Sequence, residues 1–281
     1  MRDGKVKIGV VAPASRLEPA FAEKVGELAR ALYQNCVELV FYPQCFLSWG
    51  HFAGDDETRA ASFLDVANDE SFDALWIGRG GYGSFRIAER VIAGLTEAAK
   101  RKTYLGYSDA GAILGALYKH GLHAAHGPMP ADIAREGGDK AVKRALAFLV
   151  KGAAGSLEST VAPGTKTAAY NMTVLSHVLG TPLEPDLSGH ILMLEDVSEH
   201  MYRIDRTLFH ITTTPAIRKV AGIKLGRCSD IPPNAPDFSQ SEEDVARHWC
   251  AMSGIAYLGR ADIGHDIENK VVPFGSLHKI P

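Results

Sequence analysis

The first half of the chain alternates short apolar runs with longer segments of helical character. Four apolar runs have the length expected of buried strands: residues 6–12, 37–41, 73–77 and 103–106. Four other segments are typical of helices, either by the spacing of their apolar residues or by acidic residues at their start: 17–33, 55–67, 85–93 and 110–120. Strands that alternate with helices predict an α/β fold, a mostly parallel sheet with helices on both faces.

The second half is less regular and predicts a smaller α/β domain. Residues 151–166 are rich in small and turn-forming residues, which indicates a domain boundary. We expect an N-terminal parallel α/β domain at 1–152, a linker at 153–166 and a C-terminal α/β domain at 167–281. Inside the last, the pattern predicts these elements in order: a helix at 171–179, a strand at 189–195, a helix at 202–211, a strand at 220–225, a loop at 230–239 and a helix from 241.

Charge and composition limit the classes of function. The 281 residues carry a formal net charge of −3, and no run rich in Lys and Arg would attract a nucleic acid or a membrane surface. No apolar run has the roughly 18 residues of a membrane helix, and the first residues lack a signal-peptide pattern. Four cysteines without a C-x-x-C spacing fit a reducing compartment. These features predict a cytoplasmic protein.

A serine lies where the fourth predicted strand meets the next helix. The segment Gly106-Tyr-Ser108-Asp-Ala-Gly111 is close to the nucleophile-elbow pattern, in which a tight turn exposes the serine hydroxyl. The second glycine comes one position later than in that pattern, and a serine in this place can also cap the helix. From this motif alone, both interpretations of Ser108 stay open.

A glycine-rich turn, Arg79-Gly-Gly-Tyr-Gly83, follows the third predicted strand. Its glycines let the backbone approach a ligand closely. The turn could supply an N–H to an oxyanion, cradle a phosphate, or be no more than a tight turn; it lacks the Lys-Ser/Thr ending of a P-loop. Ligands of open α/β sheets bind beyond the carboxyl ends of the strands, where both this turn and Ser108 are expected.

Acids and histidines in the second half could complete a catalytic site. The segment Leu194-Glu-Asp-Val-Ser-Glu199 ends a predicted strand with three acids, which could orient a histidine, bind a metal or form a solvated strand end. His265 lies in a glycine-led loop and is available as a base, with His126 as its main rival. No H-E-x-x-H or comparable spacing points to a metal site.

Taken together, these segments resemble the LD-carboxypeptidase family of serine peptidases, the muramoyltetrapeptide carboxypeptidases, to which the microcin C self-immunity peptidases also belong. The resemblance covers nearly the whole chain and rests on the order of eight segments: 7–15, 52–59, 79–83, 106–109, 126–129, 189–196, 202–206 and 264–265. Two segments differ from the family. Ala169-Tyr-Asn-Met172 replaces Gly-Gly-Asn-Leu, and Ser198-Glu-His-Met201 lacks a proline that is common there, so the substrate-selecting surface is expected to differ.

The resemblance implies a two-domain fold with the catalytic centre between the domains. It implies no cofactor and no metal. The implied triad consists of Ser108, Glu195 and His265. The implied oxyanion hole consists of the backbone N–H groups of Gly81 and Asp109, with Gly80 close enough to replace Gly81. A carboxypeptidase must also bind a free carboxylate. Arg79 and Arg86 flank the glycine turn, and each could bind the carboxylate or form an internal salt bridge.

The implied activity is release of terminal D-Ala from cytoplasmic murein tetrapeptides, at the L,D bond after meso-diaminopimelate, as a step of peptidoglycan recycling. The partner would be a small peptide or muropeptide, and the resemblance allows a homodimer. Three alternatives stay open. One is a peptidase that cleaves an aminoacyl-nucleotide antibiotic, which an aromatic loop beside the site would favour. The others are a non-catalytic two-domain binding protein and a phosphate-binding α/β enzyme.

Overall fold

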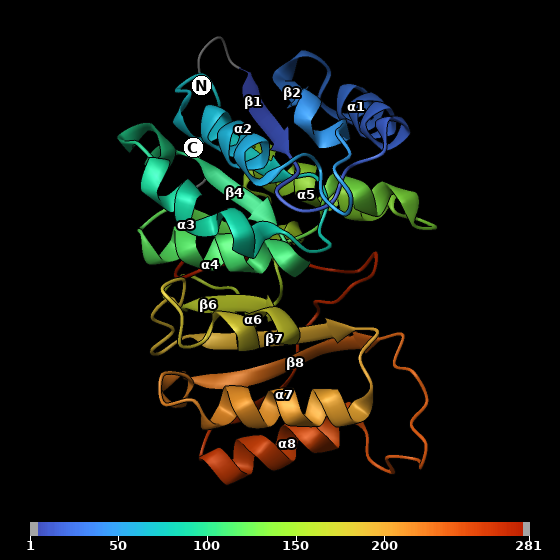
Figure 1. Cartoon of the computed structure of the whole chain (residues 1–281), viewed down its shortest axis with the longest axis vertical. Helices are drawn as coiled ribbons and strands as arrows, with labels where there is room; N and C mark the ends of the chain where they lie inside the picture. Colours follow the sequence, from blue (N-terminus) through green and yellow to red (C-terminus); the bar gives the residue numbers. More distant parts are fainter. Residues whose placement is uncertain (1–4, 278–281) are drawn as a thin grey trace.

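The protein consists of two α/β domains stacked along its long axis (Figure 1). The structure is a computed structural model that describes residues 5–277. Residues 1–4 of the expected first domain and residues 278–281 of the expected second domain lie outside the described residues. Strands of the first domain are β1 (Val6–Val11), β2 (Val37–Phe41), β3 (Ala74–Ile77), β4 (Thr103–Gly106) and β5 (His123–His126). Its helices are α1 (Pro19–Tyr33), α2 (Asp56–Asn68), α3 (Ser84–Gly94), α4 (Gly111–Lys119) and α5 (Asp139–Lys151).

The first sheet has the strand order β10-β5-β4-β3-β1-β2, in which β10 is Val272–Pro273 from the end of the described chain. Its pairs are parallel except the one between β10 and β5. Two separate apolar clusters cover its faces, one built with α2, α3 and α4 and the other with α1 and α5. A parallel sheet buried on both faces explains the continuous apolar runs of the sequence. The predicted α/β class is confirmed.

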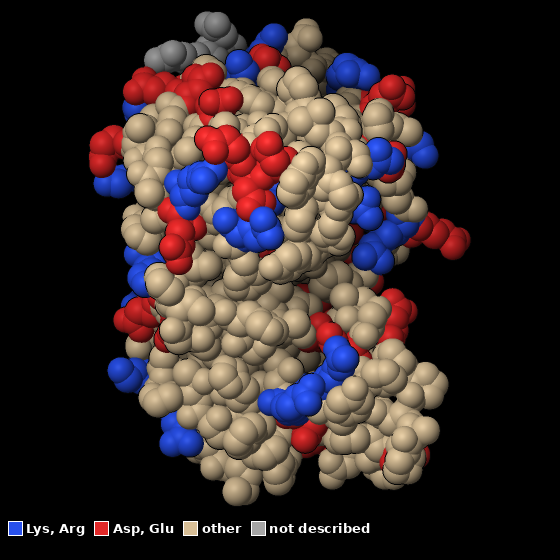
Figure 2. All heavy atoms as spheres, viewed as in Figure 1, with Lys and Arg blue, Asp and Glu red and all other residues tan. Residues whose placement is uncertain are grey.

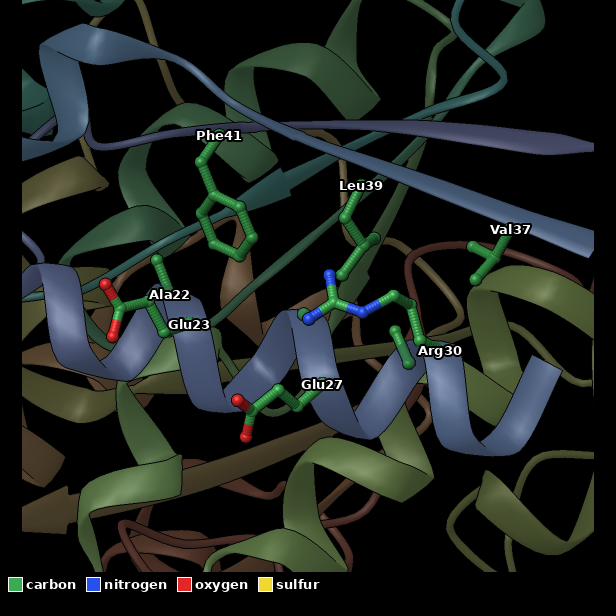
Figure 3. A pocket seen from close by; sticks show the side chains of 9 residues that line it. Ala22, Glu23, Glu27, Arg30, Val37, Leu39 and Phe41 are labelled. Carbon is green, nitrogen blue, oxygen red and sulfur yellow. The ribbon is translucent and has the colours of Figure 1, made fainter. Parts of the chain in front are cut away.

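The edge strand β2 is only half buried, and a shallow depression lies between it and α1 (Figure 3). The side chain of Arg30 lies along this strand near Leu39, while Glu23 and Glu27 line the opposite, helical side. A long charged side chain over an edge strand hinders its pairing with another chain, which is how many proteins protect such edges.

The second domain has a four-stranded parallel sheet with the order β6-β7-β8-β9. Its strands are β6 (Thr167–Asn171), β7 (Ile191–Val197), β8 (Gly222–Ser229) and β9 (Tyr257–Arg260). Its helices are α6 (Met172–Val178), α7 (Met201–Thr213) and α8 (Glu242–Ser253), all of which pack into one apolar cluster with the sheet. The opposite face is covered by a smaller cluster that includes Ala261, Ile263 and Val272, so the chain after β9 lies there.

Helix α4, which follows the serine turn, lies between the two sheets (Figure 1). Its glycines allow the close approach of β6. A Cβ added to Gly115 would lie 2.1 Å from the hydroxyl oxygen of Tyr170, and one added to Gly111 would lie 3.1 Å from the same ring. The helix that carries the turn is therefore fixed against the second domain.

The last described segment returns to the first domain. Strand β10 (Val272–Pro273) pairs antiparallel with β5, and two residues later Gly275 exchanges backbone hydrogen bonds of 2.8 and 3.0 Å with Thr167 at the start of β6. The expected division assigned all of 167–281 to the C-terminal domain, whereas the structure places β10 on the first sheet. We keep 153–166 as the proposed linker.

Charges of both signs are mixed over the face in Figure 2, and the surface is hollowed between the domains on the side where β4 and β7 end. Of the helices that the structure describes, none combines the length and the apolar character that crossing a membrane requires.

Candidate active site

Ser108 lies at the carboxyl end of β4, in the turn that leads into α4. Its φ is +62°, in the left-handed region that non-glycine residues rarely occupy. The turn is so tight that a Cβ on Gly106 would lie 3.2 Å from Ala110 Cβ. Tyr107 and Ala110, not Ser108, occupy the cap positions of the two helical segments. A strained serine between strand and helix favours the nucleophile interpretation over the cap.

The glycine turn after β3 lies directly against Ser108. A Cβ added to Gly80 would lie 3.1 Å from Ser108 Oγ, so only a glycine leaves space above the hydroxyl. Gly81 is exposed, with φ of +111°, and within residues 5–277 its N–H has no protein acceptor. The N–H of Asp109 belongs to the first turn after the serine, where no intrahelical acceptor exists. Both N–H groups can therefore bind a ligand.

The carboxylate of Asp109 connects the serine turn to the glycine turn. Its Oδ2 accepts the backbone N–H of Ser84, the first residue of α3, at 2.8 Å. Burial raises the pKa of this carboxyl, and the N–H groups of Ser84 and Gly83 partly offset that effect. This contact fixes the two turns relative to each other. An oxyanion hole made of one backbone N–H from each turn needs such a fixed arrangement.

His265 and Glu195 form a short, buried hydrogen bond. Glu195 lies on β7 and is fully buried, and its Oε2 accepts a hydrogen bond from His265 Nδ1 at 2.5 Å. Burial pulls the pKa of His265 down, but the charge and the hydrogen bond of Glu195 more than offset this, so that the pKa lies above its ordinary value. The bond at Nδ1 directs Nε2 to the opposite side of the ring, where a base is needed.

The ring of His265 lies beside the serine turn. Its centroid is 4.9 Å from that of Tyr107, the residue directly before Ser108. Tyr107 is itself fixed, because its hydroxyl donates to Asp132 Oδ1 at 2.8 Å. Residues from three distant parts of the sequence, around 108, 195 and 265, are thus brought into one neighbourhood at the ends of β4 and β7.

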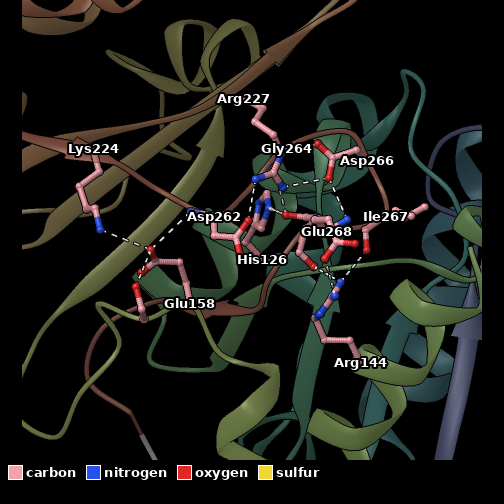
Figure 4. A network of polar contacts seen from close by, with 12 residues as sticks. His126, Arg144, Glu158, Lys224, Arg227, Asp262, Gly264, Asp266, Ile267 and Glu268 are labelled. Carbon is pink, nitrogen blue, oxygen red and sulfur yellow. Dashed lines mark hydrogen bonds and ion pairs between the residues drawn. The ribbon is translucent and has the colours of Figure 1, made fainter. Parts of the chain in front are cut away.

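Two arginines hold the loop that carries His265 (Figure 4). Arg227 on β8 pairs with Asp262 Oδ1 at 2.6 Å and with Asp266 through two nitrogens. Arg144 on α5 belongs to the other domain, and its Nη1 donates to the carbonyl oxygens of Ile267 and Asn269 at 2.7 and 2.9 Å. The loop is therefore anchored to both domains, immediately before and after the histidine.

His126, the rival base, has a supporting role. It is buried, and its Nε2 lies 3.0 Å from Asn269 Oδ1, which also accepts the N–H of Gly264 at 3.2 Å. An oxygen that accepts from Gly264 must accept from His126 as well, so the imidazole carries its proton on Nε2. Burial lowers the pKa of His126, which keeps it neutral. Through Asn269, His126 therefore stabilises the position of Gly264, the residue before His265.

The second acid at the end of β7 does not orient the histidine. Asp196 accepts hydrogen bonds from Asn171 Nδ2 at 2.8 Å and from Thr173 Oγ1 at 3.0 Å. Burial and the charge of Glu195 raise its pKa to about 6. Glu199, the third acid, pairs at 3.4 Å with Arg203. Of the three acids, Glu195 makes the contact with His265.

The two candidate arginines differ in their partners. Arg86 pairs with both carboxylate oxygens of Asp56, at 3.0 and 2.9 Å from its Nε, and thus forms an internal salt bridge. Arg79 donates to the carbonyl oxygen of Arg16 at 3.1 Å and forms no ion pair with any described residue. Its charge remains uncompensated by a carboxylate, at the start of the glycine turn.

Residues 5–277 contain no group of three or more His, Cys, Asp or Glu side chains placed to hold a metal ion. Sequence reasoning missed Arg144, Arg227 and Asn269, because their roles depend on contacts across at least 35 positions. It also missed an aromatic turn around Trp49, for which Trp49-Gly-His-Phe52 was a visible signal.

Comparison with known proteins defines the class of this α/β protein. Residues 8–127 match the LD-carboxypeptidase N-terminal domain, and residues 166–280 match the LD-carboxypeptidase C-terminal domain. A putative carboxypeptidase of Synechocystis sp. is 32% identical over 244 residues, which are 85% of this chain and 80% of that protein. A murein tetrapeptide carboxypeptidase of Pseudomonas aeruginosa is 27% identical over 97% of this chain and 92% of that protein.

Solved structures share the fold. The muramoyltetrapeptide carboxypeptidase from Oxalobacter formigenes superposes with a TM-score of 0.80 at 23% identity, over 95% of this chain and 93% of that chain. The protein MccF in complex with glutamyl sulfamoyl guanosine gives a TM-score of 0.77 at 16% identity, over 97% and 92%. The protein is thus a serine-type carboxypeptidase. It belongs to the LD-carboxypeptidase family, as its sequence motifs predicted.

Proposed function

We propose that Ser108, Glu195 and His265 form the catalytic triad of this carboxypeptidase. The observation that carries the proposal is the 2.5 Å hydrogen bond between Glu195 and His265, with the imidazole 4.9 Å, centroid to centroid, from the ring that precedes Ser108. The raised pKa of His265 supports its role, since a base is most effective when its pKa lies near the working pH. The strained φ of Ser108 supports its role as nucleophile.

The chemistry is acyl transfer in two halves. His265 takes the proton of Ser108 while Oγ attacks the scissile carbonyl carbon, and the N–H groups of Gly81 and Asp109 bind the oxyanion. The imidazolium, stabilised by Glu195, then protonates the leaving amine, and the peptide bond breaks. In the second half, the same imidazole takes a proton from water while the water oxygen attacks the acyl carbon. The imidazolium then returns that proton to Ser108 Oγ as the acyl–oxygen bond breaks and the acid leaves.

The proposed substrate is a murein tetrapeptide in the cytoplasm, with D-Ala as the leaving residue during peptidoglycan recycling. Support comes from relatives named for this activity at 27–28% identity over 96–97% of the chain. Arg79 is the cation we assign to the free carboxylate, because Asp56 already neutralises Arg86. A carboxylate that replaces the Arg16 carbonyl as partner would gain a charge-assisted bond.

Replacement of Ser108 by alanine tests the proposal. The Ser108→Ala variant is expected to release no D-Ala from a disaccharide tetrapeptide and to lose labelling by a fluorophosphonate, while its melting temperature stays within a few degrees of the wild type. Ser253→Ala, at the end of α8, is the control that keeps both properties. Wild-type turnover in Ser108→Ala would remove this serine from the mechanism.

One observation favours a second candidate, the cleavage of an aminoacyl nucleotide. An exposed aromatic turn, Trp49–Phe52, lies beside the glycine turn, because Phe52 and Tyr82 have ring centroids 6.2 Å apart. Aromatic faces stack readily on nucleobases. Turnover of an aminoacyl sulfamoyl adenosine at a higher kcat/KM than that of a murein tetrapeptide would favour this candidate over the first.

A further inference from the structure

Two neighbouring loops at the site carry a cluster of exposed aromatic side chains. In the first loop, Trp49 and Phe52 exchange both backbone hydrogen bonds, at 2.9 and 3.1 Å, so residues 49–52 form a closed turn. The second loop is the glycine turn, whose Tyr82 is 51% exposed, while Trp49 is 54% exposed. A contiguous group of exposed aromatic side chains, unlike a single one, is typical of a binding site.

The rings form an open, tilted surface. Trp49 stacks on Phe52 with centroids 6.1 Å apart and planes 29° apart. Phe52 is tilted by 47° against Tyr82, and His51 lies 5.3 Å from Phe52 and 6.4 Å from Tyr82. Because the faces of Phe52 and Tyr82 diverge by 47°, the surface is open enough for a thick, puckered ring.

The base of this surface is rigid. The guanidinium of Arg59 lies 4.7 Å from the centroid of Phe52, and that of Arg86 lies 5.3 Å from it. Arg59 is buried and donates to the carbonyl oxygen of Gly83 at 2.9 Å, which ties the aromatic turn to the glycine turn. A preformed surface binds a ligand without an ordering cost.

The surface lies within reach of the nucleophile. Tyr82 comes two residues after Gly80, whose added Cβ would lie 3.1 Å from Ser108 Oγ. Two residues span at most about 7 Å, and the tyrosine side chain extends the distance further. The acyl side of a murein tetrapeptide has three residues between the scissile bond and the sugar, which span roughly 10 Å when extended.

We propose that Trp49, His51 and Tyr82 form a subsite that binds a sugar ring of the muropeptide, with the apolar face of the ring on the aromatic surface. The inference rests on the proposed murein substrate. Rigid aromatic side chains supply large contact area at low entropy cost, and the imidazole of His51 adds a hydrogen-bonding group for hydroxyls or the acetamido group.

A neutral sugar fits this surface without any contribution from the cations beneath it. The cations beneath the surface, Arg59 and Arg86, are both paired with Asp56. The two guanidinium groups share one carboxylate, so a net positive charge remains beneath the rings, but both groups are already engaged as donors to Asp56. The saccharide of a muropeptide, linked to the peptide through an amide, carries no charge in this region and needs none.

The test compares two substrates that differ only in the sugar. The kcat/KM for a disaccharide tetrapeptide is divided by that for the free tetrapeptide, so that a general loss of activity cancels. Trp49→Ala is expected to lower this ratio roughly tenfold, as loss of one aromatic contact face implies, and Trp49→Phe to lower it less. Phe209→Ala, at an exposed aromatic on α7 of the other domain, is the matched control and should keep the wild-type ratio.

A binding experiment separates failure of the subsite from failure of the proposed function. The inactive Ser108→Ala protein is titrated with the N-acetylglucosaminyl-N-acetylmuramic acid disaccharide, without peptide, and indole fluorescence is followed. A saturable change that disappears in Ser108→Ala/Trp49→Phe supports the subsite even if the enzyme cleaves no tetrapeptide. An unchanged substrate ratio in Trp49→Ala overturns it. So does a titration in which an aminoacyl sulfamoyl adenosine, and not the disaccharide, responds to Trp49.

Discussion

Replacement of Glu195 by glutamine removes one charge from the site and almost no volume. The carboxylate is fully buried, its Oε2 accepts from His265 Nδ1 at 2.5 Å, and its Oε1 has no partner among the described residues. A glutamine carbonyl oxygen can accept the same bond, so the imidazole keeps its position and tautomer. What the variant loses is the negative charge that stabilises the imidazolium formed during attack.

The size of the loss follows from the separation of the charges. Two unit charges about 4 Å apart, at an effective dielectric constant near 20, interact by about 4 kcal/mol. At about 1.4 kcal/mol per factor of ten, kcat should fall roughly a thousandfold.

The pH dependence gives an independent readout with a definite sign. His265 must be neutral to accept the serine proton, so kcat/KM of the wild type rises with pH through the pKa of His265, which lies above the ordinary value of about 6.5. Without the charge of Glu195, burial acts with less opposition and the pKa falls. The acid limb of Glu195→Gln should therefore shift to lower pH, although the maximal rate is lower.

The assay measures release of D-Ala across the pH range, with a melting curve at each pH. Glu199→Gln, four residues later, makes the same chemical change at a partly exposed ion pair with Arg203, which is worth about 1 kcal/mol or less, and should keep both rate and profile. A loss below tenfold in Glu195→Gln, or an acid limb that does not move, would refute the assigned role of Glu195.

Two further substitutions test the packing around the site. Gly80→Ala places a methyl group about 3 Å from Ser108 Oγ and should lower kcat/KM at least about a hundredfold, with little change in melting temperature. Gly155→Ala, where a Cβ meets nothing within 4 Å, is its control, and equal activity of the two variants would contradict the assigned position of the glycine turn. Tyr170→Phe removes a buried hydroxyl that has no partner among residues 5–277, and should raise the melting temperature by about 2 °C; a lower value in differential scanning calorimetry would show that the hydroxyl is satisfied.

Local patterns predicted much of the first domain. Apolar runs of parallel strands, the apolar spacing of α1 and the acidic start of α2 are local properties, so β1 to β4 and these helices lie where they were expected. Strand β5 was missed because His-Ala-Ala-His is neither apolar nor alternating; its pairing with β4 and β10 makes it a strand. Strand β6, Thr-Ala-Ala-Tyr-Asn, was missed for a similar reason. It lies close to α4 because that helix has glycines where Tyr170 packs.

The site divides in the same way. The turn at Ser108 and the glycine turn have sequence signatures, because tight backbone conformations restrict residue type. The contact between Glu195 and His265 joins positions 70 residues apart, and only the family resemblance pointed to it. Arg144 reaches its loop across 123 positions, and no local pattern distinguishes it from other arginines of an amphipathic helix.

The return of the chain to the first sheet through β10 ties the base to both halves of the enzyme. The backbone passes from β9, in the second sheet, through the His265 loop to β10, which pairs with β5 and, through Gly275, with Thr167. The loop is thus a bridge fixed at both ends, and a rotation of one half against the other would stretch it. In a chimera that combines the first domain of one relative with the C-terminal half of another, β10 of the second must therefore pair correctly with β5 of the first. If it does not, the histidine will be misplaced relative to the serine.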